Sequence, residues 1–414
     1  MLILQAVKRR LKSIGPLYRT NARWKSWRLK LRNRGLADFY RREADRRALS
    51  YSEEESVALL RQRLAARGLP RSIPVGQKPR VLWVGTNWNQ DNSGFLSALQ
   101  RCAEVRAVVD WNGEYGLRSD SPLLYDPSLV KRNSQMLVKQ IAEFRRNGPV
   151  DLVFGQMWAN FLSPDALRHA RDAGAVTVNL ALDDRLPEHW AWHHHVRLGA
   201  VGLCAAVDLT LTTSPEALVR YWVEDCPAVF FAMASDANIF RPSPESEKEF
   251  DVTFVGARYG IRAEIVDALQ HAGVSIDAFG PGWPNGPVSA ERAAEIFSRS
   301  RIILGIGTVG HNHDVYTLKL RDFDAPMAGA LYLTHRNPDL TPLYEEGQEI
   351  VCYASIDECI EKVRYYLSHP EERMSIAARG LQRARREHTW DRRFEYLFNI
   401  VGLRSQRDAT VDVA

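Results

Sequence analysis

Two patterns of apolar residues alternate along this chain from Val81 onward. One is a short run that is apolar on both faces, which is typical of parallel strands covered by helices on either side. The other repeats at helical spacing, as in residues 355–367. The expected strands form two series, Val81–Val84, Val105–Val109, Leu152–Phe154, Val176–Leu180 and Leu209–Thr212, then Val252–Val255, Ser275–Phe279, Ile302–Ile306, Leu331–Thr334 and Glu349–Tyr353.

Capping residues mark several helix starts. Ser163 and Ser214 each place a hydroxyl before a proline at the first helical position, and Ser355 with Glu358 forms a capping box. This alternation of strand and helix predicts an α/β protein with two doubly wound, Rossmann-like domains that face each other across a cleft.

The Pro- and Ser-rich segment 238–249 separates the two series of strands. We therefore expect an N-terminal domain over residues 76–238 and a C-terminal domain over residues 239–388. A helical extension over residues 1–75 precedes them, and a helical segment over residues 389–414 follows. The length of 414 residues suits two such domains with additional segments.

Charge is distributed unevenly along the chain. The net charge is +5, yet residues 1–50 carry fifteen Lys and Arg against three acids, a net +12, and the remaining residues carry −7. Trp24, Trp27, Leu31 and Phe39 are interleaved with these basic residues. Three interpretations stay open, namely a surface helix packed on the body, a contact between residues 1–50 and an anionic membrane, and nucleic-acid binding. The third is disfavoured because no nucleic-acid-binding motif accompanies the charge.

The cysteines and the N-terminus bear on location. The five cysteines form no C-x-x-C pair and their number is odd, which favours a reducing compartment over a disulfide framework or a structural zinc site. No window approaches 18 uncharged apolar residues, and the apolar start is too short for a secretory signal. We expect a cytoplasmic protein or one peripheral to the inner face of a membrane.

The segment 316–334 carries the strongest chemical signal. A short helix bearing Lys319, Arg321 and Asp324 is expected to end at Gly329 and to lead directly into a buried strand. A carboxylate at this place can accept hydrogen bonds from a ribose diol, and basic groups on the preceding turn can meet a diphosphate. Each charge-assisted bond contributes roughly 1.5–3 kcal/mol when it is shielded from water.

Two polar segments follow strands of the N-terminal domain. The loop 85–94 does not fit G-x-G-x-x-G, so a dinucleotide cofactor is disfavoured. Asp183 and Asp184 follow the strand at 176–180, and a carboxylate there can take a proton from an acceptor hydroxyl. His189 and His193 begin a histidine cluster without an H-E-x-x-H pattern, so we expect no metal there but an aromatic-rich helix that lines the cleft.

The run R-D-F-D-x-P-x-A-G-A-L-Y-L-T at 321–334 resembles the R-x-F-E-x-x-x-x-G-x-x-x-x-T signature of CgeB-like glycosyltransferases. Segments 251–262, 279–283, 349–353, 365–371 and 388–390 resemble further motifs of that family in the same order. The likeness covers about residues 80–400. Asp324 stands where the family has Glu, and the first carboxylate of the related E-x7-E pattern falls at Tyr316.

The resemblance implies a GT-B fold and a nucleotide-diphosphate sugar as donor. It implies that the C-terminal helix returns to the N-terminal domain. The implied donor-binding residues are Gly256, Arg258, Arg262, Gly280, Gly282, Trp283, Lys319, Arg321, Asp324 and Gly329. The catalytic candidates are Asp183, Asp184 and Asp91, and the acceptor-side candidates are Asn87, Asn89, His189 and His193.

The expected function is transfer of a sugar to a hydroxyl of a glycan, a lipid-linked acceptor or a protein, as in the synthesis of cell-surface polysaccharide or glycoprotein. Basic side chains would neutralise the leaving diphosphate, so we expect no cofactor and no metal. Two alternatives remain open: a nucleotide-sugar epimerase on the same fold, and a non-catalytic glycan-binding or scaffold protein.

Overall fold

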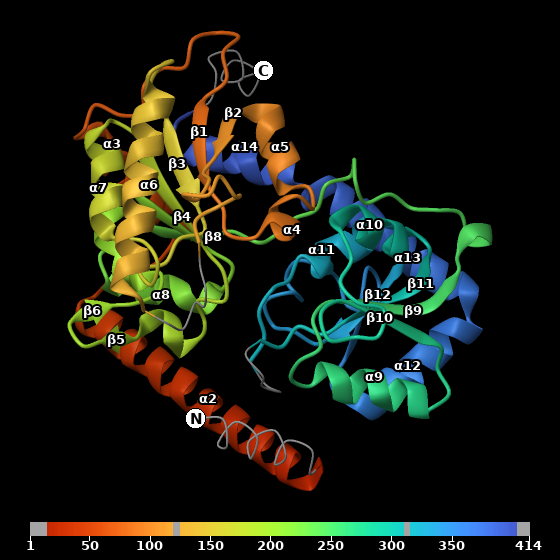
Figure 1. Cartoon of the computed structure of the whole chain (residues 1–414). Helices are drawn as coiled ribbons and strands as arrows, with labels where there is room; N and C mark the ends of the chain where they lie inside the picture. The colour runs from red at the N-terminus through yellow and green to blue at the C-terminus, as the bar shows by residue number, and fades with distance from the viewer. Residues whose placement is uncertain (1–14, 119–124, 310–314, 404–414) are drawn as a thin grey trace.

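The computed structural model describes residues 15–118, 125–309 and 315–403, and it contains two parallel sheets in two domains (Figure 1). The first sheet has the order β2-β1-β3-β4-β7-β8, and all its neighbouring strands are parallel. Its strands are β1 (Arg80–Val84), β2 (Glu104–Ala107), β3 (Leu152–Gly155), β4 (Val176–Ala181), β7 (Leu209–Thr212) and β8 (Ala228–Phe230).

The second sheet has the order β10-β9-β11-β12-β13 and is also parallel throughout. Its strands are β9 (Phe250–Val255), β10 (Ile276–Phe279), β11 (Ser300–Gly305), β12 (Leu331–His335) and β13 (Val351–Tyr353). The predicted doubly wound α/β class is confirmed. All ten expected strands are present, with ends shifted by one or two residues, and β8 is an additional strand that the sequence analysis did not predict.

Helices cover both sheets, so the strands are buried on both faces. Every residue of β1 and of β4 is buried, as expected for parallel strands between helical layers. The first domain contains α4 (Trp88–Asp91), α5 (Phe95–Cys102), α6 (Pro127–Arg145), α7 (Pro164–Asp172) and α8 (Leu218–Val223), with short 3-10 turns at Pro187–Trp190, Val201–Ala206 and Pro215–Ala217. A 3-10 turn at Glu245–Glu247 leads into the second domain, which contains α9 (Arg262–His271), α10 (Ala290–Ser298), α11 (Arg321–Met327), α12 (Ile356–Ser368) and α13 (Pro370–Glu387).

The part of the N-terminal extension that the structure describes contains α2 (Gly15–Arg46) and α3 (Glu53–Ala65). Gly35 would be expected to weaken a helix, yet α2 continues through it without interruption. α2 packs against α8 and buries Ala37, Tyr40 and Ala44. Contacts with the body therefore stabilise the helix at a glycine that alone would weaken it. Among the residues that the structure describes, no helix is both long enough and apolar enough to cross a bilayer.

The last described helix, α14 (Trp390–Ile400), packs against α5 of the first domain (Figure 1). The ring centroids of Trp390 and Phe95 lie 5.0 Å apart, and Trp390 is completely buried. Backbone hydrogen bonds also join Ser235 to both sides of Thr389. The chain thus crosses between the domains twice at the same place.

The aromatic-rich helix expected around His189 is wrong. Residues 187–197 form a 3-10 turn followed by a two-stranded hairpin, β5 (Trp192–His193) and β6 (Val196–Arg197). Trp190 points inward, where its Nε1 donates to the backbone oxygen of Asp184 and its ring packs against Tyr40 and Tyr221. His194 has a φ of +52°, which closes the hairpin. Tertiary packing of Trp190 therefore prevails over local helical spacing.

Candidate active site

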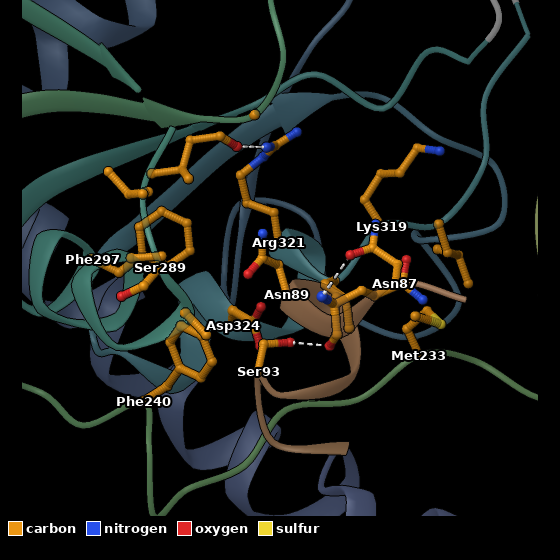
Figure 2. A pocket seen from close by; sticks show the side chains of 18 of the residues that line it. Asn87, Asn89, Ser93, Met233, Phe240, Ser289, Phe297, Lys319, Arg321 and Asp324 are labelled. Carbon is orange, nitrogen blue, oxygen red and sulfur yellow. Dashed lines mark hydrogen bonds between the residues drawn. The ribbon is translucent and has the colours of Figure 1, made fainter. Parts of the chain in front are cut away.

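A cavity of about 400 Å³ lies between the two domains. The first domain contributes the loop after β1 and the end of β4, and the second contributes the loop after β9, the start of α10 and the start of α11. Ligands of doubly wound folds bind at such carboxyl ends of parallel strands. Figure 2 shows the side chains that line this cavity.

One side of the cavity is apolar. Phe240 and Phe297 lie together there, next to Ser289 at the N-terminus of α10 (Figure 2). The side chain of Ser289 accepts a hydrogen bond from the backbone nitrogen of Arg292 and so caps α10. Sequence reasoning missed these residues. The Ser289 cap was a readable signal, whereas Phe240 lies in the linker and carries no pattern.

Asp324 lies on α11 between the apolar side and the basic side of the cavity (Figure 2). It is 5% exposed, and its Oδ1 has no hydrogen-bond partner among the described residues. Burial raises the pKa of its carboxyl group well above the usual range. A buried carboxylate oxygen without a partner costs free energy, so it is suited to accept hydrogen bonds from a ligand.

Two arginines form the basic centre of the cavity. Arg321, at the start of α11, donates to the backbone oxygen of Val255, and Arg262, at the start of α9, donates to that of Ala257 over 3.0 Å. Neither forms an ion pair with a described carboxylate, and the Nε of each lacks a partner. Burial, reinforced by the nearby Arg321 charge, lowers the pKa of Arg262 to about 10. Two buried like charges at one wall are suited to bind an anion.

Gly256 permits this arrangement. A Cβ atom there would lie 2.9 Å from Nη1 of Arg321 and 3.2 Å from the ring of Phe254. The loop after β9 therefore needs glycine to let the guanidinium groups approach the backbone.

Lys319 reaches across the cavity to the first domain. It lies just before α11. The expectation that the helix itself bears Lys319 is therefore wrong. The Nζ of Lys319 lies 2.9 Å from Oδ1 of Asp183, which also accepts a 2.9 Å hydrogen bond from Oγ1 of Thr317. Burial alone would raise the pKa of Asp183, but Lys319 and Thr317 together hold that pKa below its usual range.

The two aspartates after β4 lie in different environments. Asp183 lines the cavity, whereas Asp184 is completely buried and accepts hydrogen bonds from Thr212 and Tyr221. Burial raises the pKa of Asp184. Of the pair, Asp183 alone has access to a ligand.

The loop after β1 forms the opposite wall. Asn87 and Asn89 line the cavity, and Asn87 also caps α4 by accepting from the backbone nitrogen of Gln90. Asp91 does not line the cavity. It is buried behind this loop, where Trp83 and Tyr115 donate hydrogen bonds of 3.1 and 2.6 Å to it. Burial raises the pKa of Asp91 to about 6, against the opposing effect of these bonds.

Several candidates lie outside the cavity lining. Arg258 is partly exposed, 3.8 Å from Asp267, with its guanidinium over the ring of Trp283. Trp283 is buried and donates to the backbone oxygen of Gly256 over 2.8 Å, so its turn supports the Gly256 loop from behind. The remaining candidates outside the lining are Gly280, Gly282, Gly329, Asp184, Asp91, His189 and His193.

The histidines of the cluster do not gather around a common point. His189 is buried against the ring of Trp158, and His193 is exposed on the hairpin. The described residues contain no group of three or more His, Cys, Asp or Glu side chains that could hold a metal ion. His311 and His313 precede α11 in the sequence and could contact a phosphate or simply occupy a loop, but they lie outside the described residues.

A family model whose description is "Glycosyl transferase-like" matches residues 262–399. The matched region contains Arg262, Lys319, Arg321 and Asp324, that is, the basic centre and the buried carboxylate of the cavity. Residues 262–399 are thus similar to a glycosyltransferase domain, and this supports a transferase. No curated protein sequence matches the chain.

Solved structures resemble the whole two-domain body. Sucrose-phosphate synthase from Thermosynechococcus elongatus superposes with a TM-score of 0.51 at 12% identity, over 78% of this chain and 98% of that one. HepE from Anabaena, solved in complex with UDP and glucose, superposes with a TM-score of 0.53 at 10% identity, over 78% and 99%. A glycosyltransferase from Rickettsia africae gives 0.50 at 10% identity, over 79% and 98%. At such identities the likeness establishes the GT-B fold.

Proposed function

We propose that this glycosyltransferase takes a nucleotide-diphosphate sugar as donor and transfers its sugar to an acceptor hydroxyl. The observation that carries the proposal is the position of Asp324 beside Arg262 and Arg321. Among the described residues, one oxygen of this buried carboxylate has no hydrogen-bond partner, and neither guanidinium group has a carboxylate partner. A nucleoside diphosphate presents hydroxyl donors and an anion next to one another. HepE, which has the same fold, was solved with UDP and with UDP-glucose, and this supports the choice of donor.

The order of groups along the cavity suggests an orientation for the donor (Figure 2). The base would lie at the apolar side formed by Phe240 and Phe297, and the ribose hydroxyls would face Asp324. The diphosphate would meet Arg262 and Arg321, which leaves the sugar near Asn87 and Asp183. Each group of the donor then meets side chains of matching polarity or charge.

The leaving diphosphate would be stabilised by protein cations. Arg262, Arg321 and Lys319 bring three positive charges to the cavity, and preorganised charges of this kind stabilise a leaving group without reorganisation. We therefore propose a metal-independent transfer with no further cofactor.

We propose Asp183 as the base that takes the proton of the acceptor hydroxyl. It is the described carboxylate on the first-domain wall of the cavity, and the acceptor would enter past Asn87 and Asn89. The acceptor would be a glycan, a lipid-linked saccharide or a protein, within the CgeB-like group and in the synthesis of cell-surface glycans. This assignment draws on the motifs at 251–262 and 321–334.

The test is turnover of UDP-, GDP- and dTDP-sugars, with the nucleotide and sugar products separated by chromatography and identified by mass and by NMR. We expect nucleoside diphosphate release by the wild type and at least a hundredfold loss in Arg321→Gln, because removing a charge-assisted contact to a leaving group costs about 3 kcal/mol. Arg258→Gln is the matched control: it removes an arginine of the same domain that lies outside the cavity lining, and it should leave turnover within twofold.

Other outcomes would replace this proposal. Conversion of one nucleotide sugar into an isomer of equal mass, with the diphosphate bond intact, would indicate an epimerase. Nucleotide binding without any turnover would indicate a non-catalytic protein. Equal losses in Arg321→Gln and Arg258→Gln would mean that the cavity is not the donor site.

We propose further that α2 contacts an anionic membrane. Trp24, Trp27, Leu31 and Phe39 are each about half exposed (48–56%), and they lie on the side of α2 opposite to the buried Ala37 and Tyr40. The exposed basic residues around them are Lys25, Arg28, Lys30, Arg32, Arg34, Arg41 and Arg42. Aromatic side chains amid basic ones suit a lipid surface, and each basic residue contributes about 1 kcal/mol near anionic lipid.

Co-sedimentation with vesicles tests this contact. The full chain should sediment with phosphatidylglycerol-containing vesicles and much less with phosphatidylcholine alone, and Trp24→Ser with Trp27→Ser should abolish the difference. Trp192→Ser removes an equally exposed tryptophan from the hairpin and serves as the control. Equal sedimentation of all variants would contradict the proposal. The free state of all five cysteines is consistent with the cytoplasmic side of such a membrane.

A further inference from the structure

Asp183 and Lys319 face each other across the cavity from different domains. The distance of 2.9 Å between Nζ and Oδ1 is that of a hydrogen-bonded ion pair, and both side chains keep some exposure, 20% for Lys319 and 37% for Asp183. The lysine charge in the cavity is therefore paired with a carboxylate, whereas Arg262 and Arg321 have no such partner among the described residues. Of the three cations, Lys319 alone must exchange one anionic partner for another if a diphosphate is to use it.

The backbone of Asp183 is held in a conformation that aspartate seldom adopts. Its φ is +55°, in the left-handed region. Four described residues other than glycine have a positive φ, and Asp183 is the one of these that lines the cavity. Such strain persists where neighbouring contacts fix it, and it is common at ligand sites. Here the contacts are those from Thr317 and Lys319.

We propose that the donor diphosphate and the carboxylate of Asp183 compete for Lys319, so that donor binding releases Asp183 to act as the base. This inference rests on the proposed function of the cavity. In the transfer, the acceptor O–H bond breaks and its proton passes to Asp183, while the acceptor oxygen bonds to the anomeric carbon. The bond from that carbon to the phosphate oxygen breaks, and its electron pair leaves on the nucleoside diphosphate.

The charges around Asp183 support this order of events. Burial raises the pKa of Asp183, while Lys319, Thr317 and, through space, His189 lower it to below the usual range. The negative charge of Asp183 also raises the pKa of Arg262, against the larger lowering by burial. A carboxylate held at a low pKa is a weak base. When Lys319 turns to the diphosphate, burial is no longer offset by the ion pair and the basicity of Asp183 rises. The base then becomes competent only with donor in place.

Asp183→Asn tests the competition directly. Asparagine has the same size, tolerates a left-handed φ and can still accept the hydrogen bond from Thr317, but it does not hold the Lys319 charge. We expect this variant to bind the wild type's preferred nucleoside diphosphate (UDP, GDP or dTDP) about fivefold more tightly, because a partly exposed ion pair no longer has to break. Lys319→Gln should bind it more weakly than the wild type.

Asp339→Asn is the matched control. Asp339 forms the other cross-domain ion pair of this region, 2.6 Å from Arg185, and it does not line the cavity. Its substitution should leave nucleotide affinity within twofold. Tightening equal to that of Asp183→Asn would attribute the effect to loosened domains and overturn the competition.

Steady-state kinetics distinguish the loss of a base at Asp183 from a purely structural effect of the substitution. In Asp183→Asn we expect the KM for donor to fall while kcat for transfer falls at least a hundredfold, since base catalysis contributes about 10²–10⁴. If the wild type binds no nucleoside diphosphate, the proposed function itself fails. If the wild type binds one and Asp183→Asn binds it no more tightly, the competition is overturned while the donor site stands.

Discussion

Asp324 is buried, and its Oδ1 finds no hydrogen-bond partner within the part of the chain that the structure describes. Such a group destabilises the protein without its ligand and is therefore retained where a ligand uses it. Because burial raises its pKa, the protonated form stabilises the folded chain, and this contribution is lost as the pH rises through the folded-state pKa.

Asp324→Asn should stabilise the protein and weaken nucleotide binding at the same time. Removal of a buried carboxylate with an unpartnered oxygen should raise the free energy of unfolding by about 1–3 kcal/mol at pH 7.5. The amide cannot replace a charged acceptor for the ribose hydroxyls, so affinity should fall about tenfold. Thermal unfolding and calorimetry on the same sample check both. A variant that loses stability and keeps affinity would contradict the role of Asp324.

The buried carboxyl group of Asp91 should make the free energy of unfolding depend on pH. Its pKa is raised to about 6 in the folded protein, so the folded chain retains a proton that the unfolded chain has lost. The stabilisation of the folded chain by this proton is complete below about pH 4. It decreases as the pH rises to about 6, by roughly 3 kcal/mol in total. In Asp91→Asn this decrease should be absent, which urea unfolding at pH 5 and pH 7.5 measures. Parallel pH profiles for wild type and variant would show that Asp91 has no such role.

At the residue level, the sequence indicated several side chains that line the cavity but not always which of two neighbours faces it. Asp183 and Asp184 are adjacent after the same strand, and nothing in their spacing tells which one faces the cavity. In the structure Asp183 has a positive φ, and its carboxylate contacts residues more than 130 positions away, which no local pattern contains. Lys319, Arg321 and Asp324 were found because one helix start brings them together.

At the scale of secondary-structure elements, α11 is a short helix, and its stability depends on the residues at its ends. Gly329 follows the last turn of α11 with a φ of +70°, where a Cβ atom would lie 2.6 Å from Cβ of Pro242. Gly273 occupies the same position after α9, with a φ of +78° and open space around it. Both glycines end a helix in the left-handed conformation, but Gly329 is also packed against Pro242.

Gly329→Ala should therefore be clearly more destabilising than Gly273→Ala. The left-handed conformation alone costs alanine about 1 kcal/mol, which is the expected loss at position 273. At position 329 Pro242 must move as well, and we expect a total loss of about 2–4 kcal/mol. Urea unfolding of the two variants gives the comparison. Equal losses would indicate that the packing against Pro242 contributes nothing.

The elements that the sequence predicted best are the buried parallel strands, since a run that is apolar on both faces has few other solutions. The hairpin at 192–197 was missed because Trp190 packs against Tyr40 of α2, a contact that no local pattern contains. β8 was missed although it is no shorter than β13, which was predicted. Local sequence patterns thus predicted the strands around the cavity. Contacts between residues far apart in the sequence determine which side chains line it.

At the scale of the whole molecule, α14 joins the end of the second domain to the first. Trp390 is completely buried, and its ring packs near those of Phe95 and Phe394. The cavity lies between the two domains, so the packing of α14 helps to keep its walls together.

Trp390→Ala should lower the free energy of unfolding by about 3–5 kcal/mol, the usual cost of removing a large core aromatic side chain. Trp192→Ala is the matched control, because Trp192 is 61% exposed, and it should change stability by less than about 1 kcal/mol. Urea unfolding monitored by circular dichroism measures both. A small effect of Trp390→Ala would mean that α14 does not hold the domains together.

The central claim is that the cavity between the domains binds the diphosphate and ribose of a nucleotide-sugar donor. Calorimetric titration of the full chain with UDP, GDP and dTDP tests it most directly. We predict that at least one of them binds with a stoichiometry of one, that Arg321→Gln weakens this binding at least tenfold, and that Arg258→Gln does not. Absence of binding by all three, or binding that Arg321→Gln leaves unchanged, would contradict the account.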